Sequence, residues 1–414
     1  MKLAPPNEDV RKIGRDLNVK TVLEGTVRQD GRRVRITAQL DDAGNGYRVW
    51  SRSFDRDSND TLTMQREISQ AIVDALGLEL AVGGHGETAQ KAANRTELEN
   101  PEAYQSYLKG VYFSNKHTGE NVQRAISYFE DAISKAPNYA PSYSGLARCY
   151  SMLPSFTTIP TQAILDKWKT AALKALELDP RLGEAHIYLG ENYMLQYDWA
   201  SAERELKAGL QADPGNADGF RAYSVYLAKT DRLNQAIAQA RKAVDLDPVS
   251  AHASNSLGKY LYESRRYDEA IEQYRDSIQL DVNEGITHQG LGLVYLQKKM
   301  YGEGIGESEA CSRIMNGDPF ITGQLGYAYA VSGNVARARE ILANLVNQPN
   351  TRGTLSLAVA NLYIGLKDKD RAFEWLAKAV DQHDVSLFVQ SDPLYDPLRS
   401  DPRFAALLHS MNLN

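Results

Sequence analysis

Apolar residues in the C-terminal three quarters of the chain recur at helical spacing, and the segments that carry them come in pairs. Within each segment they fall at positions i, i+3, i+4 and i+7, which places them on one face of an α-helix. The second segment of successive pairs carries a small residue that lets helices approach closely, at Ala202, Ala236, Ala270, Gly304, Ala338 and Ala372. The pattern predicts paired amphipathic helices that pack on neighbouring pairs.

The pairs repeat with a fixed period. The dipeptides Asp179-Pro180, Asp213-Pro214 and Asp247-Pro248 lie 34 residues apart, and each proline stops the helix before it. Two short amphipathic helices cannot bury their apolar faces alone, so the units are expected to stack into an α-solenoid. About eight units follow from the period, at 103–137, 139–180, 183–214, 217–248, 251–282, 284–318, 320–349 and 353–382.

Two segments differ from the regular unit. Residues 152–160, which include Pro154 and Pro160, indicate a lengthened loop between the helices of the second unit. Residues 383–414 contain a loop and a short helix from Pro402 to Met411, which we expect to cap the exposed end of the array. The alternative is a detachable peptide that binds a partner.

The first eighty residues have another pattern. The segment 32–40 alternates apolar and polar side chains, which predicts a strand with one buried and one solvated face. Asp30-Gly31 before it is a hairpin signal. Together these features predict a small α/β domain with a three-stranded antiparallel sheet, built from a helix at 7–17, strands at 21–28, 32–40 and 47–54, and a helix at 62–80.

The resulting division has four parts. The α/β domain occupies residues 1–80, and the glycine-containing segment 81–100 is expected to be a linker. The helical array occupies residues 101–382, and the loop and capping helix occupy 383–414. The fold class is therefore mainly α.

The period of 34, the small residues and the terminal prolines resemble the tetratricopeptide repeat, over about three quarters of the chain. The resemblance implies a right-handed superhelix in which the first helix of each unit lines a concave surface. It also implies that this surface binds a protein or peptide partner.

The segments Ile13–Val19, Val22–Arg28 and Val34–Leu40, with Trp50-Ser51, resemble the TolB amino-terminal or FlgO-like α/β domain. In bacteria that domain often precedes tetratricopeptide arrays in larger chains that begin with a winged-helix, protein kinase or nucleotide cyclase domain. Family members have another strand and helix before the segment that matches Ile13, so the domain is expected to be incomplete here. An uncovered sheet edge invites pairing with another chain, so a homodimer or a partner strand is expected at this end.

Charge disfavours nucleic acid as a partner. The formal net charge is −6, whereas nucleic-acid binding favours a basic stripe. Arginines do gather on the predicted strands, but residues 1–80 contain as many acidic as basic side chains, and a solvated sheet face is expected there. The alternative is a nucleic-acid or phospholipid patch formed by Arg28, Arg32, Arg33, Arg35, Arg48 and Arg52.

The sequence contains no Walker-type, His-Glu-x-x-His, Gly-x-Ser-x-Gly or Cys-x-x-Cys motif, so we expect no catalytic site, no cofactor and no metal site. Gly302-x-Gly304-x-Gly306 lies in a predicted helix, where it favours helix packing over phosphate binding. The histidines are scattered over the units, and Cys149 and Cys311 are expected to fill the core.

No apolar run has signal-peptide or membrane-span length, so the cytoplasm is expected; the alternatives are the periplasm and a membrane-anchored complex.

Residues 34 apart on the first helices form rows along the expected concave surface. Adjacent rows are one helical turn apart, since residues i and i+4 are neighbours on a helix. The first row is Ile187, Arg221, Asn255, Gln289 and Gly323. The second is Glu191, Val225, Lys259, Leu293 and Tyr327, and the third is Met194, Ala228, Tyr262, Leu296 and Ala330.

The middle of these rows combines cationic, amide and phenol side chains that hold a carboxylate or a peptide backbone. With Arg148 extending the patch in the second unit, the candidate partner-binding residues are Arg148, Arg221, Asn255, Lys259, Tyr262 and Gln289. The alternative is an inner surface that only contacts water.

Three functions remain open at this point. The first is a non-enzymatic protein-interaction scaffold. The second is the sensory or assembly half of a bacterial transcriptional, kinase or cyclase regulator. The third is an enzyme with chemistry in the groove, which no residue pattern favours.

Overall fold

The chain divides into two units, residues 1–87 and 88–414, and each is described by itself. The computed structural model of this protein describes residues 10–17, 19, 21–30, 33–44, 48–57, 68, 100–116, 118–156, 161–280, 284–347, 355–384 and 388–413. The linker predicted at 81–100 and the helix predicted at 62–80 lie outside these residues, apart from Ile68 and Asn100.

The first unit contains one helix and a three-stranded antiparallel sheet in the order β1-β2-β3. The elements are α1 (Val10–Leu17), β1 (Thr21–Asp30), β2 (Arg33–Asp42) and β3 (Arg48–Asp57). In β2 the alternation predicted from the sequence holds, because Ala38 and Leu40 are buried, Gln39 between them is half-buried, and Arg33 and Arg35 are exposed. Arg35 donates to Asp55 across the sheet at 2.7 Å, so the arginines of this sheet have acidic neighbours.

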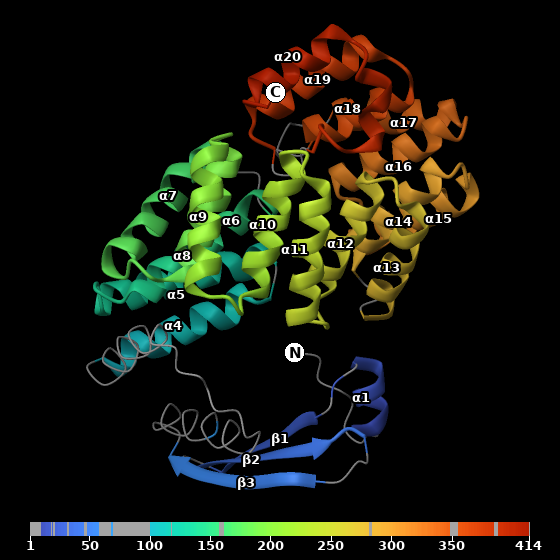
Figure 1. Cartoon of the computed structure of the whole chain (residues 1–414). Coiled ribbons are helices and arrows are strands. Elements are labelled where there is room, and N and C mark those ends of the chain that lie inside the picture. Colours follow the sequence, from blue (N-terminus) through green and yellow to red (C-terminus); the bar gives the residue numbers. More distant parts are fainter. Residues whose placement is uncertain are drawn as a thin grey trace. The chain divides into compact units, whose positions relative to one another are not determined.

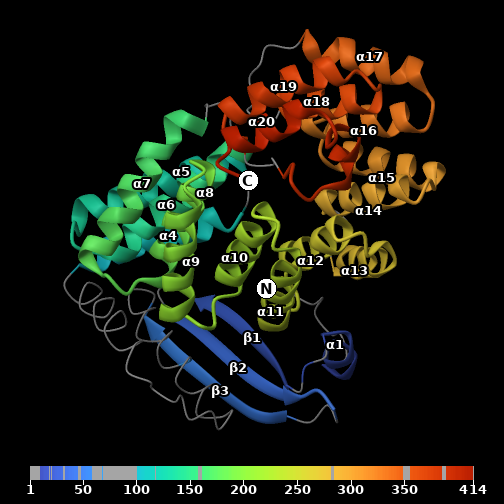
Figure 2. The same cartoon turned by 45° about the horizontal axis from the view of Figure 1, so that its top comes forward.

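The second unit is a succession of helical hairpins, which follow one another in chain order (Figure 1, Figure 2). The first helices are α4 (Pro101–Ser114), α6 (Ala140–Phe156), α8 (Gly183–Leu195), α10 (Ala217–Lys229), α12 (Ala251–Glu263), α14 (Gly285–Gln297), α16 (Pro319–Val331) and α18 (Leu355–Gly365). The second helices are α5 (Gly119–Lys135), α7 (Thr161–Leu178), α9 (Trp199–Ala212), α11 (Leu233–Leu246), α13 (Tyr267–Leu280), α15 (Tyr301–Ile314), α17 (Val335–Val346) and α19 (Lys369–Asp381).

The first helices lie on the inner side of the array. From α4 to α16, each first helix packs on the next first helix, whereas no contact of comparable extent joins consecutive second helices among the described residues. Neighbours on the inside of a bend approach more closely than those on the outside. The surface of α4, α6, α8, α10, α12, α14 and α16 is therefore called the inner surface below.

The small residues of the second helices lie where the hairpins close. Ala202, Ala236, Ala270, Ala338 and Ala372 are fully buried. Gly304 has the same role, because a Cβ there would lie 2.7 Å from the side chain of Leu296. Gly302 and Gly306 have no atom that a Cβ would meet within 4 Å. Of the three glycines of α15, only Gly304 is therefore required by helix packing.

From α8–α9 to α18–α19, each hairpin turns through a residue with left-handed backbone geometry. These positions are again 34 residues apart and have φ between 57° and 95°, at Tyr197, Asp231, Arg265, Lys299, Gly333 and Lys367. At α12, the N–H of Arg266 donates to the carbonyl of Leu261 and that of Arg265 to Tyr262. This pair of bonds is a Schellman motif, which satisfies the last carbonyls of the helix. The backbone therefore repeats with the sequence period.

One local prediction is wrong. The segment expected to be a loop from residue 152 is helical to Phe156, and Pro154 lies inside α6. Proline removes a helical hydrogen bond, but near the end of a helix this loss is small beside the gain from burial. Leu153 is buried in one core cluster with Leu165 and Trp168 of α7. Residues 157–160 of the same predicted loop lie outside the described residues.

The C-terminal end of the array packs differently from its middle. Every residue of α18 is buried, and α18 lies close to α16, since a Cβ on Gly323 would be 2.6 Å from that of Ala358. A 3-10 helix, η2 (Pro393–Leu398), and α20 (Pro402–Ser410) follow. Leu394, Leu398 and Phe404 belong to the core cluster of α18 and α19. The helix expected near the C-terminus is α20, and it packs on the last hairpin with a 3-10 helix before it.

Candidate partner-binding surface

The six side chains predicted to bind a partner lie on first helices and differ in what they contact. Arg148 on α6 donates to the hydroxyl of Ser114 on α4 at 3.1 Å. Arg221 on α10 lies 3.5 Å from Glu191 and 3.4 Å from Asp218. Both ion-pair distances are long, so the Arg221 guanidinium remains able to turn toward an added carboxylate.

Asn255 and Gln289 are the amides of the predicted site. They occupy equivalent positions on α12 and α14, and both are half-buried. Among the described residues, no hydrogen bond of either side-chain amide is recorded. An amide carries both donors and an acceptor, so the pair matches the alternating N–H and C=O groups of an extended peptide. Because neither amide bonds to a described residue, this region is called the open part of the inner surface below.

Lys259 and Tyr262 are covered by the chain itself. The ammonium of Lys259 lies 3.1 Å from the ring centroid of Phe388. The hydroxyl of the buried Tyr262 donates to Asp392 Oδ1 at 3.0 Å. The six predicted residues therefore fall into an open group and a covered pair.

The rows predicted along the surface are not continuous. Ile187 and Tyr327 are buried, and Gly323 packs under α18. All five residues of the third row are buried, namely Met194, Ala228, Tyr262, Leu296 and Ala330. The third row therefore keeps its 34-residue register but belongs to the core of the array and not to its surface.

Two acidic groups that the sequence analysis did not include among the candidate binding residues, Glu184 and Glu191, lie near the two arginines. The pKa of Glu184 is raised, chiefly because the surrounding protein removes water, and Arg148 opposes this shift. The pKa of Glu191 is raised for the same reason, and Arg221 opposes it. Carboxylates beside both arginines favour a ligand of mixed charge, such as a peptide, over a bare anion.

Residues 388–399 are called the returning segment, because they lead from the end of the array back to its middle. Ser391 Oγ donates to Glu263 Oε2 at 2.9 Å. Both carboxylate oxygens of Asp396 lie 2.8 Å from Arg265 Nη2. Lys229 lies 4.2 Å from the Phe388 ring centroid. The segment therefore contacts the C-terminal ends of α10 and α12.

Further contacts tie the end of the chain to the third repeat. Trp199 Nε1 donates to the carbonyl of Met411 at 2.8 Å. Tyr197 donates to the carbonyl of Val380, and the amide of Asn412 donates to the carbonyl of Tyr197. These partners are about 200 residues apart and follow no period, so no sequence pattern pointed to them.

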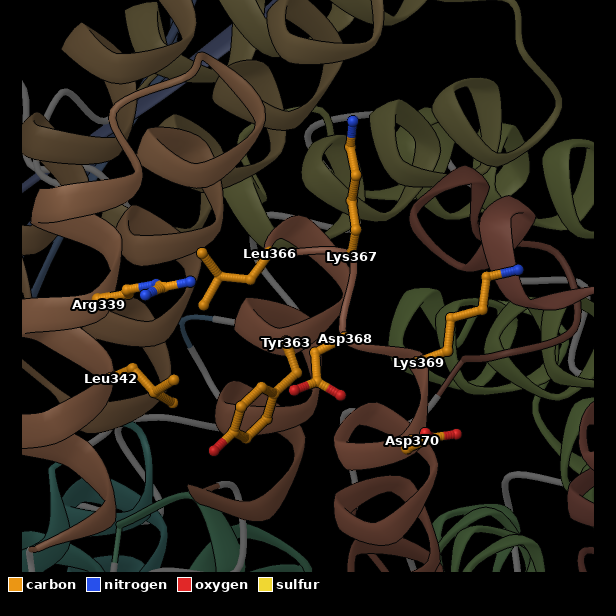
Figure 3. Close-up of a pocket in the computed structure, with 8 residues that line it drawn as sticks. All are labelled: Arg339, Leu342, Tyr363, Leu366, Lys367, Asp368, Lys369 and Asp370. Atoms are coloured by element: carbon orange, nitrogen blue, oxygen red, sulfur yellow. The ribbon is translucent and has the colours of Figure 1, made fainter.

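A surface pocket lies at the turn between α18 and α19, with Leu342 and Leu366 among its lining. Figure 3 shows Lys367 and Lys369 extending away from Leu342 and Tyr363. Asp368 accepts from the N–H of Arg371 and caps α19, and Asp370 pairs with Arg403. Its polar groups do not converge, so we assign it no ligand.

Two of the histidines pair with glutamates of their own repeats, whereas His383 contacts the carbonyl of Leu195. His186 Nδ1 lies 2.8 Å from Glu205, and His288 Nδ1 lies 2.6 Å from Glu307, 19 residues later in each case.

Burial raises the pKa of the Cys149 and Cys311 thiols to about 12. In the part of the chain that is described, no three His, Cys, Asp or Glu side chains gather to hold a metal. Within the same part, no helix is both long and apolar enough for a membrane span.

Residues 224–281 match the family model described as tetratricopeptide repeat. They run from the second half of α10 to the end of α13, where the hairpins and turns are regular. Residues 224–281 therefore contain tetratricopeptide repeats.

Two curated relatives are similar over part of this chain. Putative adenylate cyclase 3 of Rhizobium meliloti (strain 1021) is 38% identical over 96 residues, which are 23% of this chain and 16% of the relative. Transcriptional regulator HilA of Salmonella typhimurium is 26% identical over 151 residues, which are 36% of this chain and 27% of the relative. The chain therefore spans less than a third of the length of either relative.

Three solved structures are also similar. YrrB, described as a TPR protein with an unusual peptide-binding site, is 22% identical with a TM-score of 0.33, over 46% of this chain and 93% of that one. PilF of Pseudomonas aeruginosa is 23% identical with a TM-score of 0.37, over 53% and 98%. The Cut9–Hcn1 assembly of the APC/C is 20% identical with a TM-score of 0.47, over 66% and 54%.

Proposed function

We propose that this chain is a protein-interaction scaffold whose inner surface binds an extended segment of a partner protein. The observation that carries the proposal is the pair of open amides, Asn255 and Gln289, at equivalent positions of adjacent repeats. Side-chain amides at a repeat spacing bond to the backbone of a peptide without specifying its side chains. Arg221, on the preceding first helix, supplies a guanidinium for a carboxylate of the same ligand.

The proposal is tested by capture of partners from a lysate of the source cells, with identification by mass spectrometry. The Asn255→Ala/Gln289→Ala variant is expected to capture at least tenfold less partner than the unchanged chain, because two amides that bond to the ligand backbone are removed. It should still fold, since substitutions at such positions cost little stability.

The matched control is Asn234→Ala/Gln235→Ala, which makes the same two changes at exposed positions of the second helix α11. This control is expected to capture as much partner as the unchanged chain. Equal capture by both variants and the unchanged chain would show that the partner does not use the inner surface.

A second candidate is that the chain works as the sensory or assembly part of a bacterial transcriptional or cyclase regulator. The partial similarity to an adenylate cyclase and to HilA favours this candidate, as does the resemblance of the first unit to the TolB amino-terminal or FlgO-like domain. An immunoblot of the source cells with an antibody to this chain tests it. A product much larger than 414 residues is expected, and a product of that length alone would contradict it.

A further inference from the structure

The returning segment holds the array through polar side chains as well as through its apolar ones. Phe388 faces Lys229 and Lys259, Asp392 accepts from Tyr262, and Asp396 pairs with Arg265. These contacts lie on the ends of α10 and α12 and run in order along the segment at intervals of four residues. Such a series resembles the way in which a peptide ligand is recognised.

The segment is anchored independently of these contacts. Leu394, Tyr395 and Leu398 are buried in the core around α18. By contrast, the side chains of Asp396 and Arg265 are nearly half exposed, at 44% and 48%. An ion pair that water also solvates adds little stability, so the Arg265–Asp396 contact exchanges more easily than the anchor.

We propose that the returning segment is an intramolecular ligand of the array, and that a partner protein segment of the same chemistry replaces it at Lys229, Lys259, Tyr262 and Arg265. The chemistry is an aromatic side chain followed, four and eight residues later, by carboxylates. This inference rests on the proposed function and names how the same surface is regulated.

The chemistry of the covered residues explains this choice of partner. An ammonium group close to an aromatic face is attracted to it, and here two lysines share one ring. Arg265 binds both oxygens of Asp396, which selects a carboxylate. A basic segment would meet Lys229, Lys259 and Arg265 and be repelled.

The covered and open parts of the surface are continuous. Asn255 and Lys259 are one helical turn apart on α12. A peptide that follows Gln289 and Asn255 and continues along α12 therefore reaches the place that Phe388 occupies. The returning segment thus blocks one end of the path proposed for the partner.

The test uses the full chain and a synthetic peptide of residues 388–399 as the probe. In the chain, Phe388→Ala/Ser391→Ala/Asp396→Arg removes the contacts to Lys229, Lys259, Glu263 and Arg265, keeps the hydrogen bond from Tyr262 to Asp392, and leaves the three anchoring residues unchanged. Acetylation of Lys229, followed by mass spectrometry, reports opening, because this side chain is only 8% exposed in the folded protein. Fluorescence anisotropy measures uptake of the labelled peptide.

We expect Lys229 of the triple variant to react at least tenfold faster than that of the unchanged chain. The variant should also bind the peptide at least tenfold more tightly. A peptide with alanine at the positions of Phe388, Asp392 and Asp396 is the matched control and should bind neither chain. The inference is wrong if Lys229 stays protected in the triple variant, if both chains bind the peptide equally, or if neither binds it.

The two proposals fail separately. If the triple variant does not bind the peptide, but partner capture still depends on Asn255 and Gln289, only the proposed intramolecular ligand is wrong. If the variant binds the peptide, but partner capture does not depend on these two amides, only the proposed path of the partner along them is wrong.

Discussion

Glu263 shows how the returning segment changes the chemistry of single residues. Its side chain is fully buried between α12 and this segment, and burial raises the pKa of its carboxyl from 4.5 to about 7, although Lys259 opposes the shift. Asp392 raises it further, whereas the hydroxyl of Ser391 and the ammonium of Lys229 lower it. One carboxylate oxygen, Oε1, has no hydrogen-bond donor among the described residues. The folded chain therefore favours a protonated Glu263.

This shift predicts a pH dependence of stability. A raised folded-state pKa means that the folded chain binds more protons than the unfolded chain between pH 4.5 and about 7. The stabilisation from this group is complete below pH 4.5 and is lost as the pH rises through about 7. Glu263→Gln should remove that loss, so urea unfolding at pH 8 should find the variant more stable by about 1–3 kcal/mol.

The comparison of Glu263→Gln with the unchanged chain isolates this residue from the others that titrate. Lys229 acts in the opposite sense. Burial lowers the pKa of its ammonium to about 7 in the folded chain, so the unfolded chain binds more protons above that pH and the stability from this group rises with pH there. Glu303→Gln on the exposed part of α15 is the control and should shift stability little at any pH. A stability difference between Glu263→Gln and the unchanged chain that does not vary with pH would refute the raised pKa.

At the scale of the elements, the turn between the two helices of each repeat is the most regular feature of the backbone. The sequence period predicted the hairpins, but it did not reveal the left-handed turn, because only Gly333 among the turn residues is a glycine. The others are Tyr, Asp, Arg or Lys, which adopt this conformation at a cost of about 1–2 kcal/mol. Stability is therefore reduced slightly at each such turn.

Lys299→Gly is expected to raise the free energy of unfolding. Lys299 has φ 61°, and glycine adopts this conformation without strain. Glycine also makes the unfolded chain more flexible, which offsets part of the benefit and leaves a net gain in stability of about 0.5–1 kcal/mol. Gly333→Ala, at the equivalent turn with φ 95°, should lower stability by about 1 kcal/mol. Urea unfolding measures both changes in the free energy of unfolding. If both variants are more stable than the unchanged chain, or both are less stable, this account of the turn is wrong.

Pro154 and Tyr262 show what limits prediction from the sequence. A proline predicts the end of a helix, yet burial of Leu153 extends α6 past Pro154. A 34-residue row places Tyr262 on an open surface, yet Asp392, 130 residues later, covers it. The fold class and the helix pairs depend on local periodicity and were predictable. The contacts of the returning segment depend on the curvature of the whole array and were not.

At the scale of the whole second unit, the array is held at two places far apart in the sequence. Its hairpins stack in order, and its C-terminal end contacts the third repeat through Trp199 and the fifth through Arg265. Apolar burial around α18 provides most of the stabilisation at this end. Residues after the last repeat therefore also contact the middle of the array.

The claim that matters most is that the inner surface holds the partner, and site-specific photocrosslinking tests it most directly. A benzophenone amino acid is placed at Gln289 on the first helix α14, or at Gly306 on the outer part of α15, where nothing lies within 4 Å of a Cβ. With the partner captured from the lysate, the chain labelled at position 289 should form a crosslinked adduct and the chain labelled at position 306 should not. Crosslinking at 306 without crosslinking at 289 would contradict the proposed scaffold.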